Sequence, residues 1–178
     1  MTQYLVLLRG INVSGTKMIK MDALTKALLN IGFLNVQTYI QSGNVFVNST
    51  ETAAKVGLLI KQEIFKIFGH DVPAIVIDKQ QLKSCFENNP FLQDKNTDLK
   101  KLYVAFISKE LNQNSIHELK ISQFKPDEAV VDGAKIYIKY DIGAGKTRLD
   151  QKYIEKKLTV TATIRNWNTV TTLNDFFE

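Results

Sequence analysis

The residues of this chain best suited to bind a ligand are its three arginines. Of its 23 Lys and Arg residues only three are Arg, and Arg9, Arg148 and Arg165 each lie in a short stretch rich in Gly, Asn, Ser and Thr. A guanidinium is planar and always charged, and it binds a carboxylate or phosphate through two parallel hydrogen bonds. Because Lys supplies the remaining positive charge, the confinement of Arg to these stretches indicates sites for an anionic group.

Amide, hydroxyl and lysine side chains accompany the arginines in the same stretches. They would add neutral hydrogen bonds and further positive charge around a small ligand that carries phosphate or carboxylate. The predicted binding residues are Arg9, Gly10, Asn12, Lys17, Gln41, Ser42, Asn44, Gly145, Lys146, Arg148, Arg165, Asn166 and Asn168. The alternative for each arginine is structural: it would hold its own loop by bonding backbone carbonyls or a nearby carboxylate.

The segment Gly145-Lys146-Thr147 follows an expected strand and precedes an expected helix, as the end of a phosphate-binding P-loop does. A P-loop needs a glycine five residues before Gly145, and this chain has Tyr140 there. The sequence therefore argues against nucleotide hydrolysis. A more general anion site made by backbone amides stays open, and so does a plain turn from strand to helix.

Catalytic groups are sparse. His70 and His117 lie outside the arginine stretches, and Ser42 has no base near it in the sequence. With Cys85 as its only cysteine and two dispersed histidines, the chain cannot assemble a structural zinc site. The sequence thus predicts no metal site, names no cofactor and specifies no reaction, while an enzyme whose residues converge from distant positions remains an alternative.

Two similar series of elements must position the arginines. Residues 1–78 predict the order strand, helix, strand, strand, helix, strand, and residues 102–178 repeat it with a closing C-terminal helix, after a helix and linker at 79–101. The predicted strands are 4–8, 35–40, 44–47, 74–77, 102–107, 129–131, 135–140 and 161–164; the predicted main helices are 21–31, 53–68, 115–122, 150–158 and 167–177. This order predicts an α+β fold of two tandem ferredoxin-like (split βαβ) halves with antiparallel sheets.

That fold predicts which loops lie together. In the first half, residues 9–12 should lie beside the hairpin residues 41–44, because both connections leave the same edge of the sheet. In the second half, Lys146 and Arg148 should approach Arg165 and Asn166. The first strand, Leu5–Leu8, shows no alternation of polar residues, so we expect both faces of its sheet to be covered.

Composition narrows the class of partner. The net charge of +5 is mild, and no dense basic run stands out, so a nucleic acid is the less favoured alternative to a small anionic ligand. The strand Asn44–Asn48 also lacks the basic-glycine-aromatic signature of RNA-binding sheets. The single cysteine, the absence of a leader and the lack of a membrane-length apolar run predict a cytoplasmic protein with no membrane partner. Nothing indicates a particular oligomeric state.

Four stretches resemble one known family. They are Arg9–Val13, Thr38–Val45, Gly143–Leu149 and Thr163–Thr169, and together they make the chain similar to the bacterial proteins grouped as domain of unknown function 1697. The resemblance implies a cytoplasmic α+β protein with a duplicated ferredoxin-like architecture and no established activity. The chain has Ser14-Gly15-Thr16 where the family tends to have two glycines and a lysine, so Lys17 or Lys20 would have to take that lysine's place.

Overall fold

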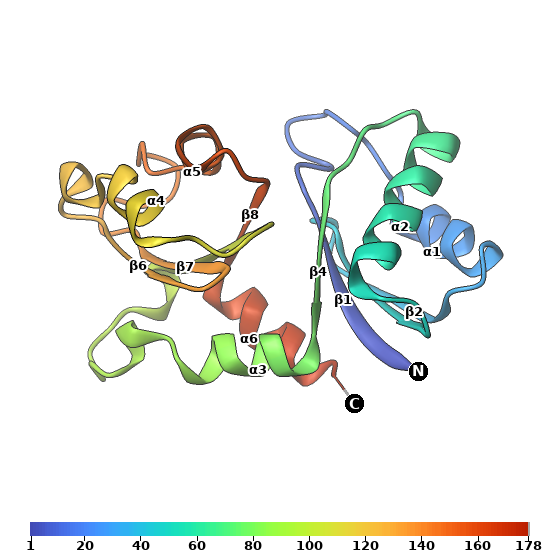
Figure 1. Ribbon diagram of the computed structural model, residues 1–178, viewed down its shortest axis with the longest axis horizontal. Helices are drawn as coiled ribbons and strands as arrows, with labels where there is room; N and C mark the ends of the chain where they lie inside the picture. Colours follow the sequence, from blue (N-terminus) through green and yellow to red (C-terminus); the bar gives the residue numbers. More distant parts are fainter. Residues whose placement is uncertain (178) are drawn as a thin grey trace. The chain divides into compact units, whose positions relative to one another are not determined.

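The computed structural model describes residues 1–177 and divides them into two compact units. The first unit comprises Met1–Leu82 together with Phe177, and the second comprises Lys83–Phe176. Each unit contains one four-stranded antiparallel sheet, and the two sheets have the same strand order (Figure 1). The predicted fold class, two tandem ferredoxin-like halves with a C-terminal helix, is confirmed.

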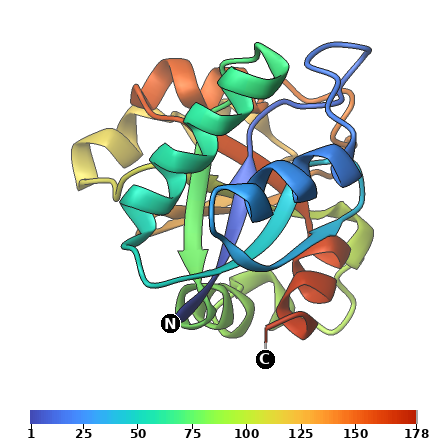
Figure 2. The same ribbon diagram turned by 90° about the vertical axis from the view of Figure 1, so that its right-hand side faces the viewer.

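The first unit has the strand order β2-β3-β1-β4, with every neighbouring pair antiparallel. Its two helices lie over one face of the sheet, which Figure 2 views from the helical side. The elements are β1 (Thr2–Leu8), α1 (Met21–Asn30), β2 (Leu34–Tyr39), β3 (Asn44–Ser49), α2 (Ala53–Phe68) and β4 (Ala74–Asp78).

The centre of the first sheet is apolar on both faces. Val6 and Leu8 of β1 belong to the core beneath the helices, while Leu5 and Leu7 point to the opposite face, and all four are fully buried. The prediction that both faces are covered is therefore confirmed. Burial of each such side chain contributes roughly 1.5–3 kcal/mol, so β1 is a major source of the unit's stability.

Local signals set the ends of α2. The Thr52 hydroxyl caps the helix by accepting a hydrogen bond from the amide of Lys55 at 3.3 Å. Gly69 ends the helix in the left-handed conformation, with φ at 70°, and its amide donates to the carbonyl of Phe65 at 2.9 Å. Such a terminus favours glycine because it has no Cβ to strain the backbone.

The second unit repeats this topology with the order β6-β7-β5-β8. Helices α4 and α5 lie on one side of its sheet, and α6 lies on the other together with the end of α3 (Figure 1). The elements are α3 (Lys79–Glu87), η1 (Pro90–Leu92), η2 (Leu99–Lys101), β5 (Leu102–Ile107), α4 (Gln113–Glu118), η3 (Ile121–Phe124), β6 (Glu128–Asp132), β7 (Lys135–Lys139), α5 (Gln151–Leu158), β8 (Ala162–Asn166) and α6 (Trp167–Asp175).

Two predicted elements of the second unit differ from the structure. The helix expected over 115–122 is broken, because Lys120 adopts a left-handed φ of 46° that ends α4 and starts η3. The strand expected over 161–164 continues to Asn166, so Arg165 belongs to a strand and not to a loop. Pairing with β5 carries the strand to this end, since Val104 lies opposite Arg165.

Cys85 lies in α3 against the sheet of the second unit and is fully buried. The hydroxyl of Tyr137 donates to the Cys85 carbonyl at 3.0 Å, and Phe86 stacks on Trp167 with ring centroids 5.5 Å apart. Burial raises the pKa of the Cys85 thiol to about 12. Because the thiolate is the reactive form, this environment makes the cysteine inert.

We therefore expect the native protein at pH 8 to react with Ellman's reagent at least about 100-fold more slowly than free cysteine does. Labelling is followed at 412 nm, and the same sample in guanidinium chloride should show one reactive thiol. Labelling of the native protein at the rate of free cysteine would mean that α3 does not shield the thiol in solution.

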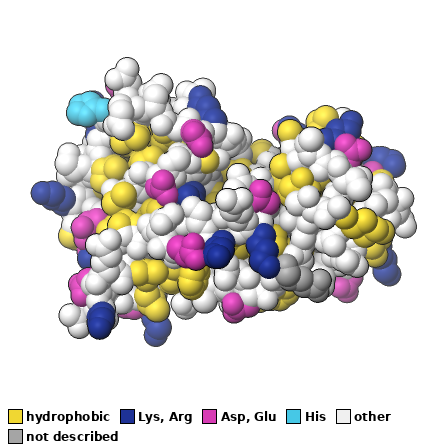
Figure 3. Space-filling model, turned by 60° about the horizontal axis from the view of Figure 1, so that its bottom comes forward, with side chains coloured by type: hydrophobic (Ala, Val, Ile, Leu, Met, Phe, Trp, Pro, Cys, Tyr) yellow, Lys and Arg dark blue, Asp and Glu magenta, His cyan; other side chains and the backbone are white. Residues whose placement is uncertain are grey.

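Charges of opposite sign are interspersed on the face of the molecule that Figure 3 shows, which agrees with the mild net charge.

Among residues 1–177, no helix combines the length and the apolarity that a crossing of the membrane requires.

Candidate functional site

Three connections of the first unit are tied together at one end of its sheet. We call this surface the first-unit edge: residues 9–20 after β1, 40–43 between β2 and β3, and 69–73 before β4. Asn12 joins two of them, because its amide nitrogen donates to the carbonyls of Ile19 at 2.9 Å and Gln41 at 2.8 Å. Its amide oxygen accepts from the Ile19 amide at 2.8 Å. The predicted proximity of residues 9–12 to the hairpin 41–44 is thus present, and Asn12 makes the connection.

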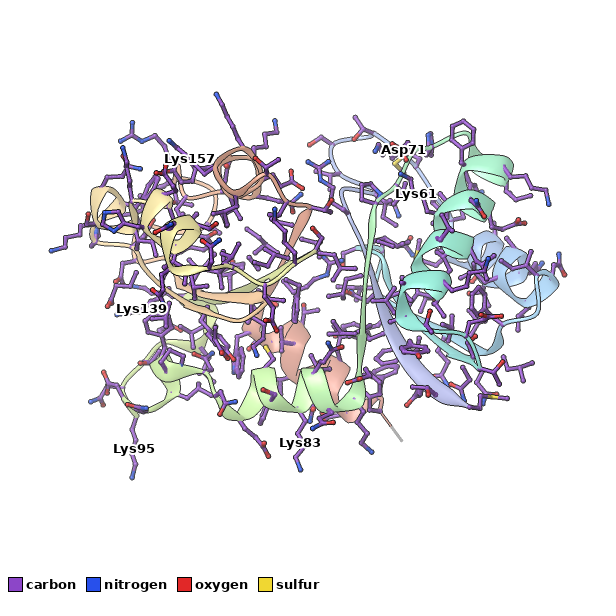
Figure 4. The ribbon with its side chains drawn as sticks, viewed as in Figure 1. Lys61, Asp71, Lys83, Lys95, Lys139 and Lys157 are labelled. Carbon is purple, nitrogen blue, oxygen red and sulfur yellow. The ribbon has the colours of Figure 1, made fainter. Side chains whose placement is uncertain are left out.

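The third connection joins the edge through Lys17 and Arg9. The ammonium of Lys17 donates to the carbonyl of Asp71, and the amide of Arg9 donates to the carbonyl of Pro73 at 2.9 Å. The Asp71 carboxylate pairs with Lys61 at 2.9 Å (Figure 4), and this hydrogen bond holds the pKa of Asp71 below its usual value. Lys17 therefore serves to fasten the edge, whatever else it contacts.

The predicted hairpin residues hold their own turn. Asn44 is fully buried, and its amide nitrogen donates to the Tyr39 carbonyl at 3.1 Å and to the Ser42 hydroxyl at 2.9 Å. Gly43 has a φ of 78° and lies so close to β1 that a Cβ there would be 2.7 Å from the Cβ of Leu8. The turn is therefore stabilised by Ser42, Gly43 and Asn44. The side chain of Gln41 is exposed.

The first-unit edge also concentrates unusual backbone conformations. Positive φ angles occur at Gly10, Asn12, Ser14, Gly15 and Lys17, and again at Ile40 in the hairpin. For a β-branched residue such as Ile40 this conformation is a genuine outlier that the surrounding contacts must enforce. The edge is thus a closely hydrogen-bonded surface, and it exposes the apolar side chains of Val13, Met18 and Ile40.

In the second unit, the glycine-rich loop (residues 140–150) is anchored from below by side chains. The hydroxyl of buried Tyr140 donates to the Leu149 carbonyl at 2.8 Å, and the carboxylate of buried Asp127 accepts from the Ile142 amide at 3.2 Å. The Thr147 hydroxyl accepts from the Leu149 amide at 3.0 Å. Neither Asp127 nor Tyr140 was among the predicted site residues. A tyrosine at the end of a predicted strand gives too little signal to identify an anchor.

The backbone of this loop is occupied with its own turns. The amides of Lys146 and Thr147 both donate to the Gly143 carbonyl, at 2.9 and 3.3 Å. At the start of α5, the Asp150 carboxylate caps the helix by accepting from the Tyr153 amide at 2.8 Å. A carboxylate in this position satisfies the helix terminus that an anion would otherwise use. These contacts favour the plain-turn interpretation of the backbone over a cradle of amides.

The side chains of Lys146 and Arg148 lie on the outside of the same loop. Both are exposed, and neither side chain forms an ion pair or hydrogen bond within residues 1–177. The loop therefore fixes their backbone while leaving their charged groups to solvent.

Arg165 differs from the other two arginines because it is 8% exposed. Its guanidinium donates to the Thr163 hydroxyl at 2.6 Å and to the Ile164 carbonyl at 3.1 Å. Burial lowers the pKa of Arg165 to about 10, because the charged form loses hydration. These contacts match the structural alternative that the sequence left open for each arginine.

The residues after Arg165 begin α6. Asn166 caps this helix, its side-chain oxygen accepting from the Thr169 amide at 2.9 Å, and Asn168 is exposed on the first turn. The ends of β7 and β8 do share one edge of the sheet, since Lys139 lies opposite Leu102 and Asn166 lies opposite Tyr103. Nevertheless, within residues 1–177 no side-chain hydrogen bond joins Lys146 or Arg148 to Arg165 or Asn166.

Two split βαβ units in tandem, with anchored polar loops at their strand ends, define a duplicated ferredoxin-like protein. The model of one family, described as protein of unknown function (DUF1697), matches residues 1–137, and the chain belongs to that family. A solved structure, that of the conserved bacterial protein SP0830 from Streptococcus pneumoniae, shares the fold with a TM-score of 0.73. It is 22% identical and aligns over 98% of this chain and 97% of its own. No curated protein matches the chain.

Proposed function

We propose that the protein binds a small anionic ligand, bearing phosphate or carboxylate, at the glycine-rich loop of its second unit. Lys146 and Arg148 are its cationic contacts. One observation carries the proposal: two exposed cations without an acidic partner in the described chain stand on a loop that Tyr140, Asp127 and Thr147 hold in place. We assign this binding to the cytoplasm, as the single-cysteine composition suggests.

The anchored loop favours binding because little order has to be created when the ligand arrives. Loops and side chains that become immobilised on binding reduce the affinity. Where the backbone is already fixed, only the two long side chains lose freedom when the ligand binds. Arg148 adds geometric selectivity, since a guanidinium can bond two oxygens of one phosphate or carboxylate at once. The amide groups of Asn12, Asn44 and Asn166 are already committed to internal hydrogen bonds and are not part of this proposal.

The burial of the sheet aromatics favours a small ligand over RNA. Ferredoxin-like RNA-binding sheets stack bases on aromatic side chains of an open face. In the second sheet Tyr137 and Phe106 are buried, and Tyr103 packs against Tyr140 with ring centroids 5.0 Å apart. These rings offer no open stacking platform.

Titration with inorganic pyrophosphate, followed by calorimetry at low salt, tests the proposal. We expect Arg148→Gln to raise the dissociation constant about five- to tenfold, because one charge-assisted contact is lost, and Lys146→Gln to act in the same direction. Arg148→Lys should recover part of the affinity, since the charge remains but the fork does not.

Lys95→Gln is the matched control. It removes one charge from the same unit at a residue that points into solvent in Figure 4 and lies outside the loop. If Lys95→Gln and Arg148→Gln weaken pyrophosphate binding equally, the effect comes from net charge alone, and a site at the loop is refuted. An affinity that falls steeply with salt for a short RNA, with no response to pyrophosphate, would favour nucleic acid instead.

A further inference from the structure

A pocket of about 470 Å³ lies in the second unit, and none of the binding residues predicted from the sequence lines it. It is formed by α4, by the turn at Lys120 and by η3. Its volume falls within the range of roughly 300–1,000 Å³ that is typical of small-molecule sites. The size alone admits a ligand of modest dimensions, so the chemistry of the lining decides what that ligand would be.

The lining combines positive charge with apolar surface. Lys120 contributes the positive charge, His117 contributes an imidazole that can form a hydrogen bond, and Ile116 and Ile121 contribute aliphatic surface. No aspartate or glutamate is among the lining residues. Lys120 forms no ion pair within residues 1–177. Such a lining favours a ligand with an anionic group at one end and an apolar body at the other.

The wall of the pocket is held by a tyrosine of the neighbouring helix. The Gln123 amide donates to the Tyr153 hydroxyl at 2.7 Å, and that hydroxyl donates to the Leu119 carbonyl at 3.0 Å. Phe124 packs edge-on against the Tyr153 ring, with centroids 4.8 Å apart. Tyr153 of α5 thus fixes both η3 and the turn that follows α4, which keeps the pocket formed without a ligand.

A further cation lies near this wall. The ammonium of Lys157 lies 5.9 Å from the centre of the Tyr153 ring, and it is exposed without an ion pair within residues 1–177. Lys120 and Lys157 therefore both contribute positive potential near the pocket wall that Tyr153 holds in place, and this potential favours the approach of an anion.

We infer that the pocket between α4 and η3 is a second ligand site, which takes a small carboxylate or phosphate monoester with an apolar body. His117 and Lys120 contact the anionic group, and Ile116 and Ile121 contact the apolar part. This site is separate from the glycine-rich loop and does not depend on the function proposed there.

Phenyl phosphate is the probe, because it joins a phosphate to a compact apolar ring. In ¹⁵N–¹H correlation spectra of the full chain, we expect its addition to shift the amide signals of residues 113–123. Lys120→Gln should raise the dissociation constant about five- to tenfold. Lys125→Gln, which removes the same charge from an exposed residue just outside the pocket, should leave it unchanged.

Three results would overturn the inference. They are the absence of shifts in residues 113–123, equal weakening by Lys120→Gln and Lys125→Gln, and equal binding of inorganic phosphate and phenyl phosphate at this pocket. The spectrum of the Lys120→Gln variant shows directly whether the fold is kept, so a binding loss with unchanged dispersed signals is a loss of the site. Arg148→Gln should leave binding of phenyl phosphate at this pocket unaffected. The proposal for the pocket is therefore tested independently of the proposal for the glycine-rich loop.

Discussion

Gly43→Ala is expected to lower the free energy of unfolding by about 3–4 kcal/mol. Two costs add at this position. The φ of 78° strains any residue with a Cβ, and that Cβ would lie 2.7 Å from the Leu8 Cβ and 3.0 Å from the Ile11 Cδ1. Leu8 is a fully buried residue of an inner strand, and its Cβ is bonded directly to the backbone, so this atom cannot move away as the end of a flexible side chain could.

The thermal midpoint measures this effect, and it should fall by roughly 6–16 °C in a protein of this size. Gly15→Ala is the matched control, because its φ of 75° is nearly the same and no atom lies within 4 Å of the added Cβ. We expect that control to lose only about 1 kcal/mol, the conformational part. If both variants melt together, the close approach of the hairpin to β1 is not present in solution.

Asn12→Asp is expected to destabilise the protein by about 2–4 kcal/mol at pH 7, although the two side chains have the same shape. The wild-type amide nitrogen donates to the carbonyls of Ile19 and Gln41, at 2.9 and 2.8 Å. In the variant a negatively charged oxygen would face the same two carbonyl oxygens. Repulsion then replaces the two hydrogen bonds, and the connections after β1 and between β2 and β3 are no longer joined through residue 12.

This loss should depend on pH with a defined sign. Protonation of the new carboxyl restores one donor, so the folded state holds the proton more tightly than the unfolded chain, where an aspartate titrates near pKa ~3.9. The variant's deficit relative to the wild type is then smallest below pH ~4, grows as the pH rises through the raised folded value, and is constant above it. Urea denaturation at pH 4 and pH 7 compares the two regimes.

Asn168→Asp is the control for Asn12→Asp. Asn168 is exposed on the first turn of α6, where a negative charge is slightly favourable, so its substitution should change stability by a few tenths of a kcal/mol at most. A deficit of Asn12→Asp that is independent of pH would show that the carboxyl does not face the two carbonyls.

The fold followed from the sequence because its signals are local and consistent. Single elements or turns are each specified by a short signal, such as the apolar run Leu5–Leu8, Gly32 after α1 and the hairpin around Gly43. The repeated order of the elements then specifies the topology. The break at Lys120 was missed because no glycine or proline marks it. A lysine adopts its left-handed conformation only through the packing of α4 and η3 around it.

The candidate site was only partly predictable, because residue type does not reveal burial. Arg148 and Arg165 lie in similar polar stretches, yet one is exposed and the other is 8% exposed in a strand. Asn12, Asn44 and Asn166 have the chemistry of ligand contacts and instead satisfy backbone groups of their own loops. The sequence predicts one helix over 115–122 and therefore no pocket beside His117, because the pocket depends on the turn at Lys120 that separates α4 from η3.

The irregular strand β2 has a consequence for behaviour at high concentration. It forms one border of the first sheet, and its pairing with β3 shifts register between Leu34 and Gln37, with Asn35 at a φ of 50°. A straight border strand offers a row of unpaired amides and carbonyls on which another molecule can extend the sheet, and Leu34 is exposed there. The bulge bends this row out of line. The same irregularity that weakens one strand therefore protects the chain against edge-to-edge aggregation.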